Sequence, residues 1–418
     1  IIAKKYFSDK MRSKFMRKKL LWIGIAAVMI LAGILFAFIF KIFDINRLSF
    51  VFNTEGQVIN LNERENLRLE NPPKIIKGIY LTAYTAADSK RVNELINLIK
   101  ETELNAVVID IKDYSGYILF DTQSDYLKKF GTEKIIIKDL EGLIKKLHQE
   151  GIYTIARITV FQDPILAKNR PDLAVKSKTT KMPWKDRKGL LWLDPASVEV
   201  WNYIFVISKV ATRLGFDELN FDYIRFPSDG NLDDLEFPFY DKQKPKNEVI
   251  KEFFQYLSQN LRPWGIKISA DLFGLVTVND GDLGIGQVLE DSLLYFDYIC
   301  PMVYPSHYAN GFIGYQNPAA YPYEVIKYSL ETAKKRMEIF QNEMLKNGGN
   351  NFKFAQLRPW LQSFDLGATY DANMIKKQKQ AVYDSLCPYE NDCVWYNGWL
   401  LWDPKNIYIP QSLERNNL

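Results

Sequence analysis

Residues 215–227 read GFDELNFDYIRFP, and this stretch establishes the kind of fold to expect. Apolar and aromatic residues lie between an opening glycine and a closing proline, which is typical of a buried strand. Side chains alternate between the two faces of a strand, so Asn220 and Asp222 share the face opposite Leu219 and Phe221. Buried polar groups are costly unless they are paired, so this face is expected to meet other polar side chains.

Seven further runs of this kind lie at 78–83, 106–111, 152–159, 266–272, 298–304, 353–360 and 395–402. The gaps between the eight runs hold segments with helical spacing, at 89–103, 135–149, 197–214, 247–261, 285–294, 323–345 and 371–386. Strict alternation predicts a parallel sheet, and eight units predict its closure. The expected fold class is therefore α/β, with a single (β/α)8 TIM barrel.

An open, doubly wound sheet is the alternative arrangement of alternating strands and helices. It usually carries a glycine-rich phosphate-binding turn after its first strand. Residues 81–90, LTAYTAADSK, contain no glycine at that place. Longer insertions at 113–133, 160–194, 225–246 and 305–322 follow expected strands, where a barrel builds its active face. Both observations favour the barrel.

The chain before the barrel divides into three segments. Residues 20–40, LLWIGIAAVMILAGILFAFIF, contain no charged residue and are long enough to cross a bilayer, so we expect a transmembrane helix preceding the barrel. A buried helix of a soluble domain is the alternative. Residues 1–19 form a basic tail, which the positive-inside rule places in the cytoplasm. Residues 41–73 are polar and predict a stalk, and residues 74–418 form the barrel, outside the cytoplasm.

Composition excludes several classes of site. Eight of the 54 basic residues lie in 1–19, and the rest of the chain is nearly neutral, so nucleic-acid binding is not expected. The chain has two histidines, His148 and His307, which argues against a zinc site built on several histidines. Cys387 and Cys393 are six positions apart in a loop-like segment, and a local disulfide is one possibility. Cys300 lies in an apolar run and is expected to be a buried thiol.

Eleven side chains on or just after the expected strands are candidates for a functional site. They are Asp110, Asp113, Arg157, Asp222, Arg225, Asp271, Tyr304, His307, Gln356, Arg358 and Trp402. Barrel enzymes place their catalytic groups at the carboxyl ends of the strands, where most of these residues lie.

Asp222, Asp271 and Asp110 are the catalytic candidates among them. Asp222 and Asp271 come from neighbouring strands and are expected at the same rim, as a pair of carboxyl groups on either side of one bond would be. Alternatively, Asp222 is held in an ion pair by Arg157 or Arg225, and Asp110 is paired with Lys112.

The remaining eight candidates are assigned to substrate binding. Arg157 and Arg358 can bind a hydroxyl or carboxylate group of a substrate or, alternatively, keep the Asp side chains ionised. Arg225 is expected to help these two arginines orient the catalytic carboxylates. Trp402 and Tyr304 offer flat apolar surfaces to a sugar ring. His307 can act in proton transfer or be an ordinary loop histidine. Asp113 and Gln356 complete this set. No metal or other cofactor is expected.

The chain resembles the bacterial family called the putative glycosyl hydrolase domain. The matching motifs include KGIYLTAYTA, NAVVIDIKDYSGYI, IYTIARITVFQDPILA, GFDELNFDYIRFPSDG, DYICPMVYPSHY, LRPWLQSF and GWLLWDP, and the resemblance runs from about residue 74 to 408. It implies a barrel distantly related to glycoside hydrolases.

The strand at 218–224 is also distantly similar to the DxDxE motif of chitinase-type barrels. Asp222 matches the second Asp, whereas Asn220 and Ile224 replace the first Asp and the catalytic Glu. Substrate-assisted cleavage through that Glu is therefore not expected, and the acid must come from Asp222, Asp271 or Asp110.

The expected function is a membrane-anchored glycoside hydrolase, outside the cytoplasm, that cleaves a cell-envelope or exopolymer polysaccharide with paired carboxylates. The alternative is a non-catalytic carbohydrate-binding barrel at the cell surface, favoured by the missing Glu at position 224. The expected partners are the polysaccharide and, through residues 20–40, the lipid bilayer. The sequence does not indicate an oligomeric state.

Overall fold

The computed structural model describes residues 67–348, 352–389 and 392–416. The predicted tail at 1–19, the span at 20–40 and nearly all of the stalk lie outside these residues. Within the described part of the chain, no helix is both long and apolar enough to cross a membrane.

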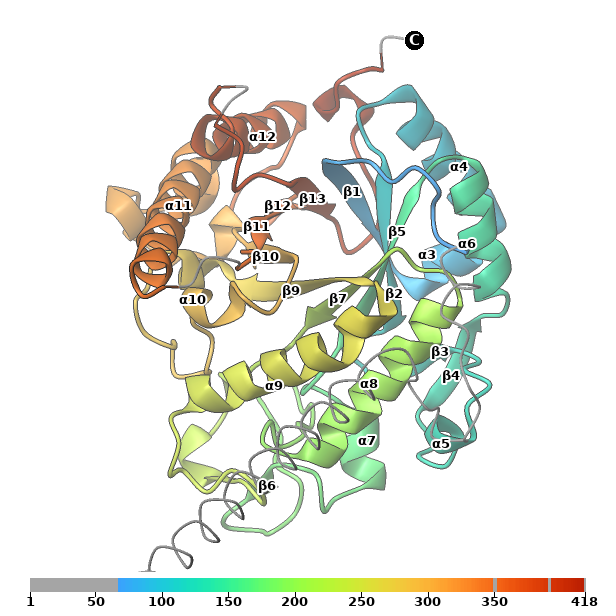
Figure 1. Ribbon diagram of the computed structural model, residues 1–418, viewed down its shortest axis with the longest axis vertical. Coiled ribbons are helices and arrows are strands. Elements are labelled where there is room, and N and C mark those ends of the chain that lie inside the picture. The colour runs from blue at the N-terminus through green and yellow to red at the C-terminus, as the bar shows by residue number, and fades with distance from the viewer. Residues whose placement is uncertain (1–66, 349–351, 390–391, 417–418) are drawn as a thin grey trace, which may run out of the picture. The chain divides into compact units, whose positions relative to one another are not determined.

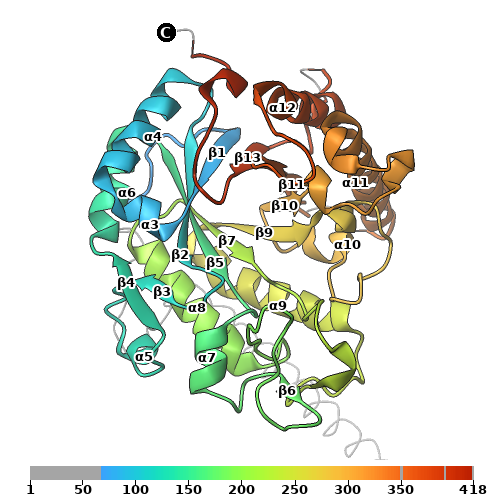
Figure 2. The ribbon, with the colours of Figure 1, turned by 180° about the vertical axis from the view of Figure 1, so that it is seen from behind.

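Eight parallel strands close into a barrel, which confirms the predicted fold. They are β1 (Ile76–Leu81), β2 (Ala106–Lys112), β5 (Tyr153–Thr159), β7 (Glu218–Asp222), β9 (Lys267–Phe273), β10 (Tyr298–Met302), β12 (Trp360–Gln362) and β13 (Gly398–Trp402). The order around the sheet is β1, β13, β12, β10, β9, β7, β5 and β2, and β1 also pairs with β2. Figures 1 and 2 show the strands at the centre and the helices around them.

Helices occupy every gap between the barrel strands. They are α3 (Ala83–Ala87), α4 (Ser89–Glu101), α6 (Leu140–Gln149), α8 (Val198–Arg213), α9 (Lys246–Leu261), α10 (Leu289–Ser292), α11 (Pro322–Lys346) and α12 (Ala372–Leu386). Several begin at a side chain that accepts hydrogen bonds from the first turn: Asp88 before α4, Ser197 before α8 and Asp371 before α12. Their buried apolar faces pack onto the sheet.

Three predicted elements differ clearly from those in the structure. The helix predicted at 135–149 begins at Leu140, because the β-branched run before it forms β4 (Glu133–Ile137), which pairs with β3 (Ile118–Phe120). The strand predicted at 353–360 is divided into β11 (Gln356–Leu357) and β12, with Pro359, which has no N–H to donate, between them. The helix predicted at 285–294 is the single turn α10.

The insertions after β2, β5 and β7 carry further short elements. They are α5 (Asp125–Lys128), α7 (Pro164–Asn169), β6 (Lys176–Ser177) and β8 (Leu235–Glu236). β6 and β8 pair antiparallel, so the insertions that follow neighbouring strands β5 and β7 are joined beside the carboxyl end of the barrel.

The barrel contains a fully buried ion pair at the amino-terminal end of its strands. Arg358 Nη1 donates to Glu218 Oε1 at 2.9 Å, and Arg358 Nη2 donates to Asn397 Oδ1 at 2.6 Å. Glu218 is the first residue of β7 and lies at the end of the barrel opposite Asp222. Because both charges have hydrogen-bonded partners, they can be buried in the floor of the barrel.

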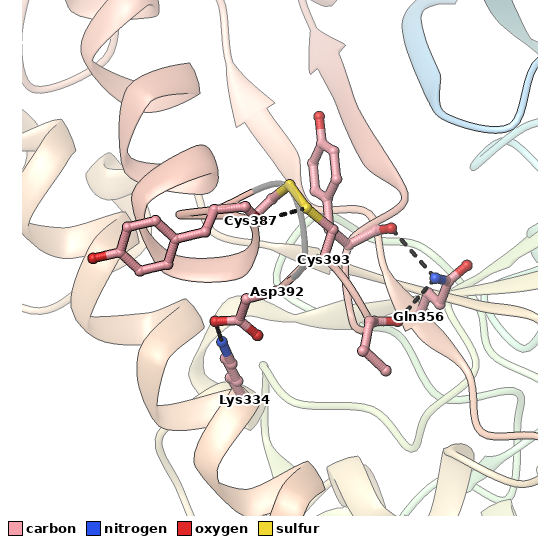
Figure 3. The surroundings of a disulfide bond; sticks show 8 residues. Lys334, Gln356, Cys387, Asp392 and Cys393 are labelled. Carbon is pink, nitrogen blue, oxygen red and sulfur yellow. Dashed lines mark hydrogen bonds and ion pairs between the residues drawn. A yellow bond between two sulfur atoms is a disulfide. The ribbon is translucent and has the colours of Figure 1, made fainter.

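A disulfide between Cys387 and Cys393 lies after α12 (Figure 3), so the sequence possibility is realised. Lys334 of α11 forms an ion pair with Asp392 at 2.8 Å beside it. Gln356 Nε2 donates to the main-chain oxygen atoms of Val394, at 2.9 Å, and Tyr396. Cys300 is fully buried, as expected.

Gly398 begins β13, where the barrel closes against β1. Its φ is +91°, and a Cβ atom there would lie 1.8 Å from the carbonyl oxygen of Ile76. Neither the dihedral angle nor the space permits a side chain.

We predict that Gly398→Ala lowers the free energy of unfolding by at least about 2 kcal/mol, because it adds a clash with the β1 backbone to a left-handed conformation. Urea unfolding of the intact chain measures this loss. Gly151→Ala is the matched control, since Gly151 also has a positive φ but nothing within 4 Å of a Cβ atom. Equal losses in the two variants would contradict the closure argument.

Candidate active site

A cavity of about 460 Å³ lies at the carboxyl ends of the barrel strands. Asp222, Phe273, Met302 and Trp402, the last residues of β7, β9, β10 and β13, all line it. Seven of the eleven sequence candidates belong to its wall, namely Arg157, Asp222, Arg225, Asp271, Tyr304, His307 and Trp402. The structure therefore brings most of the predicted set together.

Arg157, on β5, is the centre of the polar cluster. Its Nη1 donates to Asp110 Oδ1 at 2.5 Å, its Nη2 donates to Asp222 Oδ2, and its Nε lies 3.7 Å from Asp271 Oδ2. Burial alone would lower the pKa of Arg157, but the charges of Asp110 and Asp222 raise it well above its usual value. The guanidinium thus stays charged and holds acids from β2, β7 and β9.

Asp271 is held by two hydrogen bonds and has a raised pKa. Its Oδ1 accepts hydrogen bonds from Asn220 Nδ2 and from Trp360 Nε1, both at 2.8 Å. Its side chain is 1% exposed. Burial, followed by the negative charge of Asp222, raises the pKa of Asp271 to about 8. Asp271 is therefore protonated at neutral pH, and its proton belongs on Oδ2, because Oδ1 already accepts two hydrogen bonds.

Asp222 ends β7 at an unusual backbone position. Its Oδ1 accepts a hydrogen bond from the N–H of Tyr223 at 2.5 Å, and Tyr223 has a φ of +53°. A non-glycine residue in this region is strained, and such strain is concentrated at functional sites. The turn ends the strand two residues earlier than the sequence predicted and holds the Asp222 carboxylate toward Arg157.

Asp110 lies behind the cavity wall. It accepts hydrogen bonds from Arg157 and from Tyr80 Oη, the latter at 2.5 Å, and the Tyr80 ring stacks on Trp402 with a centroid distance of 3.8 Å. Burial raises the pKa of Asp110. The alternative pairing of Asp110 with Lys112 is not found, because the strand register shifts between them and Lys112 instead pairs with Asp163 at 2.9 Å.

The aromatic and histidine candidates form another part of the cavity wall. The ring centroids of Tyr304 and His307 are 5.3 Å apart, and Phe364 lies 5.7 Å from Tyr304. Burial lowers the pKa of His307, so this histidine is neutral at pH 7. Trp402, in contact with Arg157 at 4.9 Å, and Tyr304 offer ring faces of the kind that sugars contact.

Three candidates lie away from this cavity. Arg358 and Gln356 are at the amino-terminal end of the barrel, in the ion pair and main-chain contacts described above. Asp113 caps its own turn, accepting from Ser115 N–H at 3.0 Å. Alternation assigned Arg358 correctly to the inward face. It did not show that Arg358 lies nearer the amino-terminal end of the barrel than Trp360, outside the cavity.

Sequence reasoning missed several residues of the site. They are Tyr80, Lys188, Tyr223, Phe273 and Tyr308. Tyr80 was identifiable, because it alternates inward from Ile76 and Gly78. Lys188 lies in an insertion, and local patterns do not show where an insertion folds back.

In the part of the chain that the structure describes, no group of three or more His, Cys, Asp or Glu residues is arranged to hold a metal ion.

Comparison with known families adds an independent finding. The sequence profile of the family described as "Putative glycosyl hydrolase domain" matches residues 78–408. The chain belongs to this family. The match covers all eight barrel strands except the first two residues of β1, and no protein with a curated description matches the chain.

Solved structures with a similar fold include glycoside hydrolases. The glycoside hydrolase domain of PgaB (BpsB) from Bordetella bronchiseptica is 13% identical, with a TM-score of 0.53 over 82% of this chain and 99% of that one. A chitobiase from Flavobacterium johnsoniae is 11% identical, with a TM-score of 0.50 over 82% of this chain and 47% of that one. A hypothetical protein from Ruminiclostridium thermocellum is 36% identical over 46% of this chain and 96% of its own, with a TM-score of 0.43.

The raised pKa of Asp271 makes stability depend on pH. The folded state holds this proton more tightly than the unfolded state, so its contribution is complete below the ordinary aspartate pKa and is lost as pH rises toward about 8. Asn keeps the oxygen that accepts from Asn220 and Trp360, and it cannot ionise. We predict that Asp271→Asn gains stability relative to the wild type by up to about 1.4 kcal/mol per pH unit across this window.

Urea unfolding at pH 5, 6, 7 and 8 measures the difference. A constant difference between the two proteins at all four pH values would show that Asp271 has an ordinary pKa.

Proposed function

We propose that the chain is a glycoside hydrolase in which Asp271 donates a proton to the glycosidic oxygen and Asp222 acts as the carboxylate. The observation that carries the proposal is the difference between these two acids in one cavity. Asp271 is protonated, because burial and the charge of Asp222 raise its pKa to about 8, whereas Asp222 forms an ion pair with Arg157. Glycoside hydrolysis requires one carboxyl group in each of these states, on either side of the bond.

The reaction follows from these states. The proton on Asp271 Oδ2 moves to the leaving oxygen as the glycosidic bond breaks. Asp222 either bonds to the sugar carbon or takes a proton from a water molecule that attacks this carbon. In the first case, a water molecule then cleaves the bond to Asp222 and gives its proton to the Asp271 carboxylate. Arg157 Nε, 3.7 Å from Asp271 Oδ2, stabilises the carboxylate that forms on Asp271. Trp402 and Tyr304 provide ring surfaces for the sugar.

Family membership and the glycoside hydrolases of similar fold support this reaction class. We further propose that the substrate is a polysaccharide of the cell envelope or an exopolymer, and that residues 20–40 tether the barrel to the outer side of the cell membrane. The support for the tether is the uncharged run and the basic residues before it.

A non-catalytic carbohydrate-binding barrel is the second candidate. Ile224, where chitinase-type barrels have Glu, is fully buried and does not reach the cavity. In this alternative, the three acids around Arg157 serve only as its counter-ions, and they stabilise the barrel without reacting.

We predict that Asp222→Asn and Asp271→Asn each lower kcat on envelope or exopolymer polysaccharides by about a hundredfold or more, because each removes one of the two states that the reaction needs. Release of reducing ends measures the rate. Wild-type kcat/KM is expected to fall as pH rises through about 8, since Asp271 then loses its proton.

Asp280→Asn is the matched control, because the Asp280 side chain is almost fully exposed and lies outside the cavity wall. Turnover of the same size in the wild type and in Asp222→Asn would refute the proposed roles. Saturable binding without any product, unaffected by either substitution, would establish the binding alternative.

A further inference from the structure

Arg225 is a second arginine in the cavity wall, and its surroundings differ from those of Arg157. It is 7% exposed, and among the described residues it forms no ion pair within 4.0 Å. Its Nη1 donates to the main-chain oxygen of Phe226 and to Ser228 Oγ, both at 3.0 Å. Its Nε is buried and has no hydrogen-bond partner in the described structure.

Aromatic rings hold the Arg225 guanidinium in place. Its central carbon lies 4.7 Å from the ring centroid of Trp192 and 4.6 Å from that of Phe273, with Tyr223 at 5.6 Å. Such contacts offset part of the cost of burying a cation, but they do not accept its N–H groups. Burial lowers the pKa of Arg225, although an arginine stays charged in any accessible pH range.

The charges along the cavity wall leave an excess of positive charge. Its basic residues are Arg157, Arg225 and Lys188, and its acids are Asp222 and Asp271. Asp271 is protonated, and Asp222 is in an ion pair with Arg157. Among the described residues no acid forms an ion pair with Arg225 or Lys188, although the charges of Asp222, Asp229 and Asp186 act on Arg225 at longer range. Arg225 is thus held rigid with an unused donor. A buried charge that lacks a partner in the protein is costly unless a ligand supplies one.

We propose that Arg225 binds an anionic group on the sugar substrate, so that the cavity selects an acidic glycan over a neutral one. The planar guanidinium matches a carboxylate or a phosphate, and the exposed Lys188 adds a second positive charge at the same cavity. This inference rests on the proposed function, in that it takes a glycan as the occupant of the cavity. It adds the chemical class of that glycan.

The test compares sugars that differ only in the anionic group. Glucose, glucuronate and glucose 6-phosphate form one series, and galactose, galacturonate and galactose 6-phosphate form the second. Binding to the intact chain carrying Asp222→Asn is measured by titration calorimetry, so that no turnover interferes. Charge-assisted hydrogen bonds predict that at least one acidic sugar binds about tenfold to a hundredfold more tightly than its neutral counterpart.

Adding Arg225→Gln is expected to abolish this preference, measured as the ratio of the affinities for the acidic and the neutral sugar, and Arg225→Lys should retain part of it. Arg187→Gln is the matched control, because Arg187 is exposed in the same insertion as Lys188 and lies outside the cavity wall. Thermal unfolding confirms that each variant is folded. A preference for the uronates identifies a carboxylate as the anion, and a preference for the sugar phosphates identifies a phosphate.

Equal affinity for the acidic and neutral sugars in both series, or a preference that survives Arg225→Gln, would overturn the inference. These results are independent of the hydrolase proposal. An acidic preference through Arg225 in a protein that cleaves no glycan would refute only hydrolysis. Cleavage that depends on Asp222 but not on Arg225 would refute only the acidic substrate.

Discussion

The guanidinium of Arg157 lies between Asp110, Asp222 and Asp271, which belong to three different strands of one barrel. Two full ion pairs at hydrogen-bonding distance and a third, longer contact give the three acids unequal environments. A single positive charge cannot neutralise three carboxylates, so at least one acid keeps its proton when all three are buried. Asp271 is that acid, because it is the most deeply buried of the cavity-lining pair and lies farthest from the guanidinium.

Closure of the barrel makes this arrangement possible. β5 lies between β2 and β7, and β9 follows β7, so inward side chains at similar heights on these strands meet above the floor formed by Glu218 and Arg358. The ion pair between Glu218 and Arg358 is sealed from solvent. The charges at the carboxyl end of the strands face a cavity instead. The same residue types therefore have different functions at the two ends of the barrel.

Much of this organisation was predictable from the sequence, because a strand period of two residues assigns faces directly. Alternation placed Asn220, Asp222 and Asp271 inside the barrel, and the order of strands made Asp222 and Asp271 neighbours. Alternation did not show that Arg358 and Gln356 lie at the amino-terminal end of the barrel, away from the cavity at the carboxyl end. The alternative in which Asp110 is ion-paired was right, but its partner is Arg157 and not Lys112, because a register shift in β2 is not visible in local sequence. The sequence identified Arg225 as a candidate for the site. It did not show that Arg225 lacks an acidic partner, because ion pairing depends on three-dimensional contacts.

The proposed mechanism depends on a protonated Asp271 beside Asp222, and the ¹³C NMR titration of the Asp271 carboxyl group tests this most directly. With the signal assigned by its loss in Asp271→Asn, the account predicts titration near pH 8 in the wild type. It also predicts a shift to lower pH in Asp222→Asn, where the neighbouring negative charge is absent. Titration near the ordinary aspartate value in both proteins would contradict it.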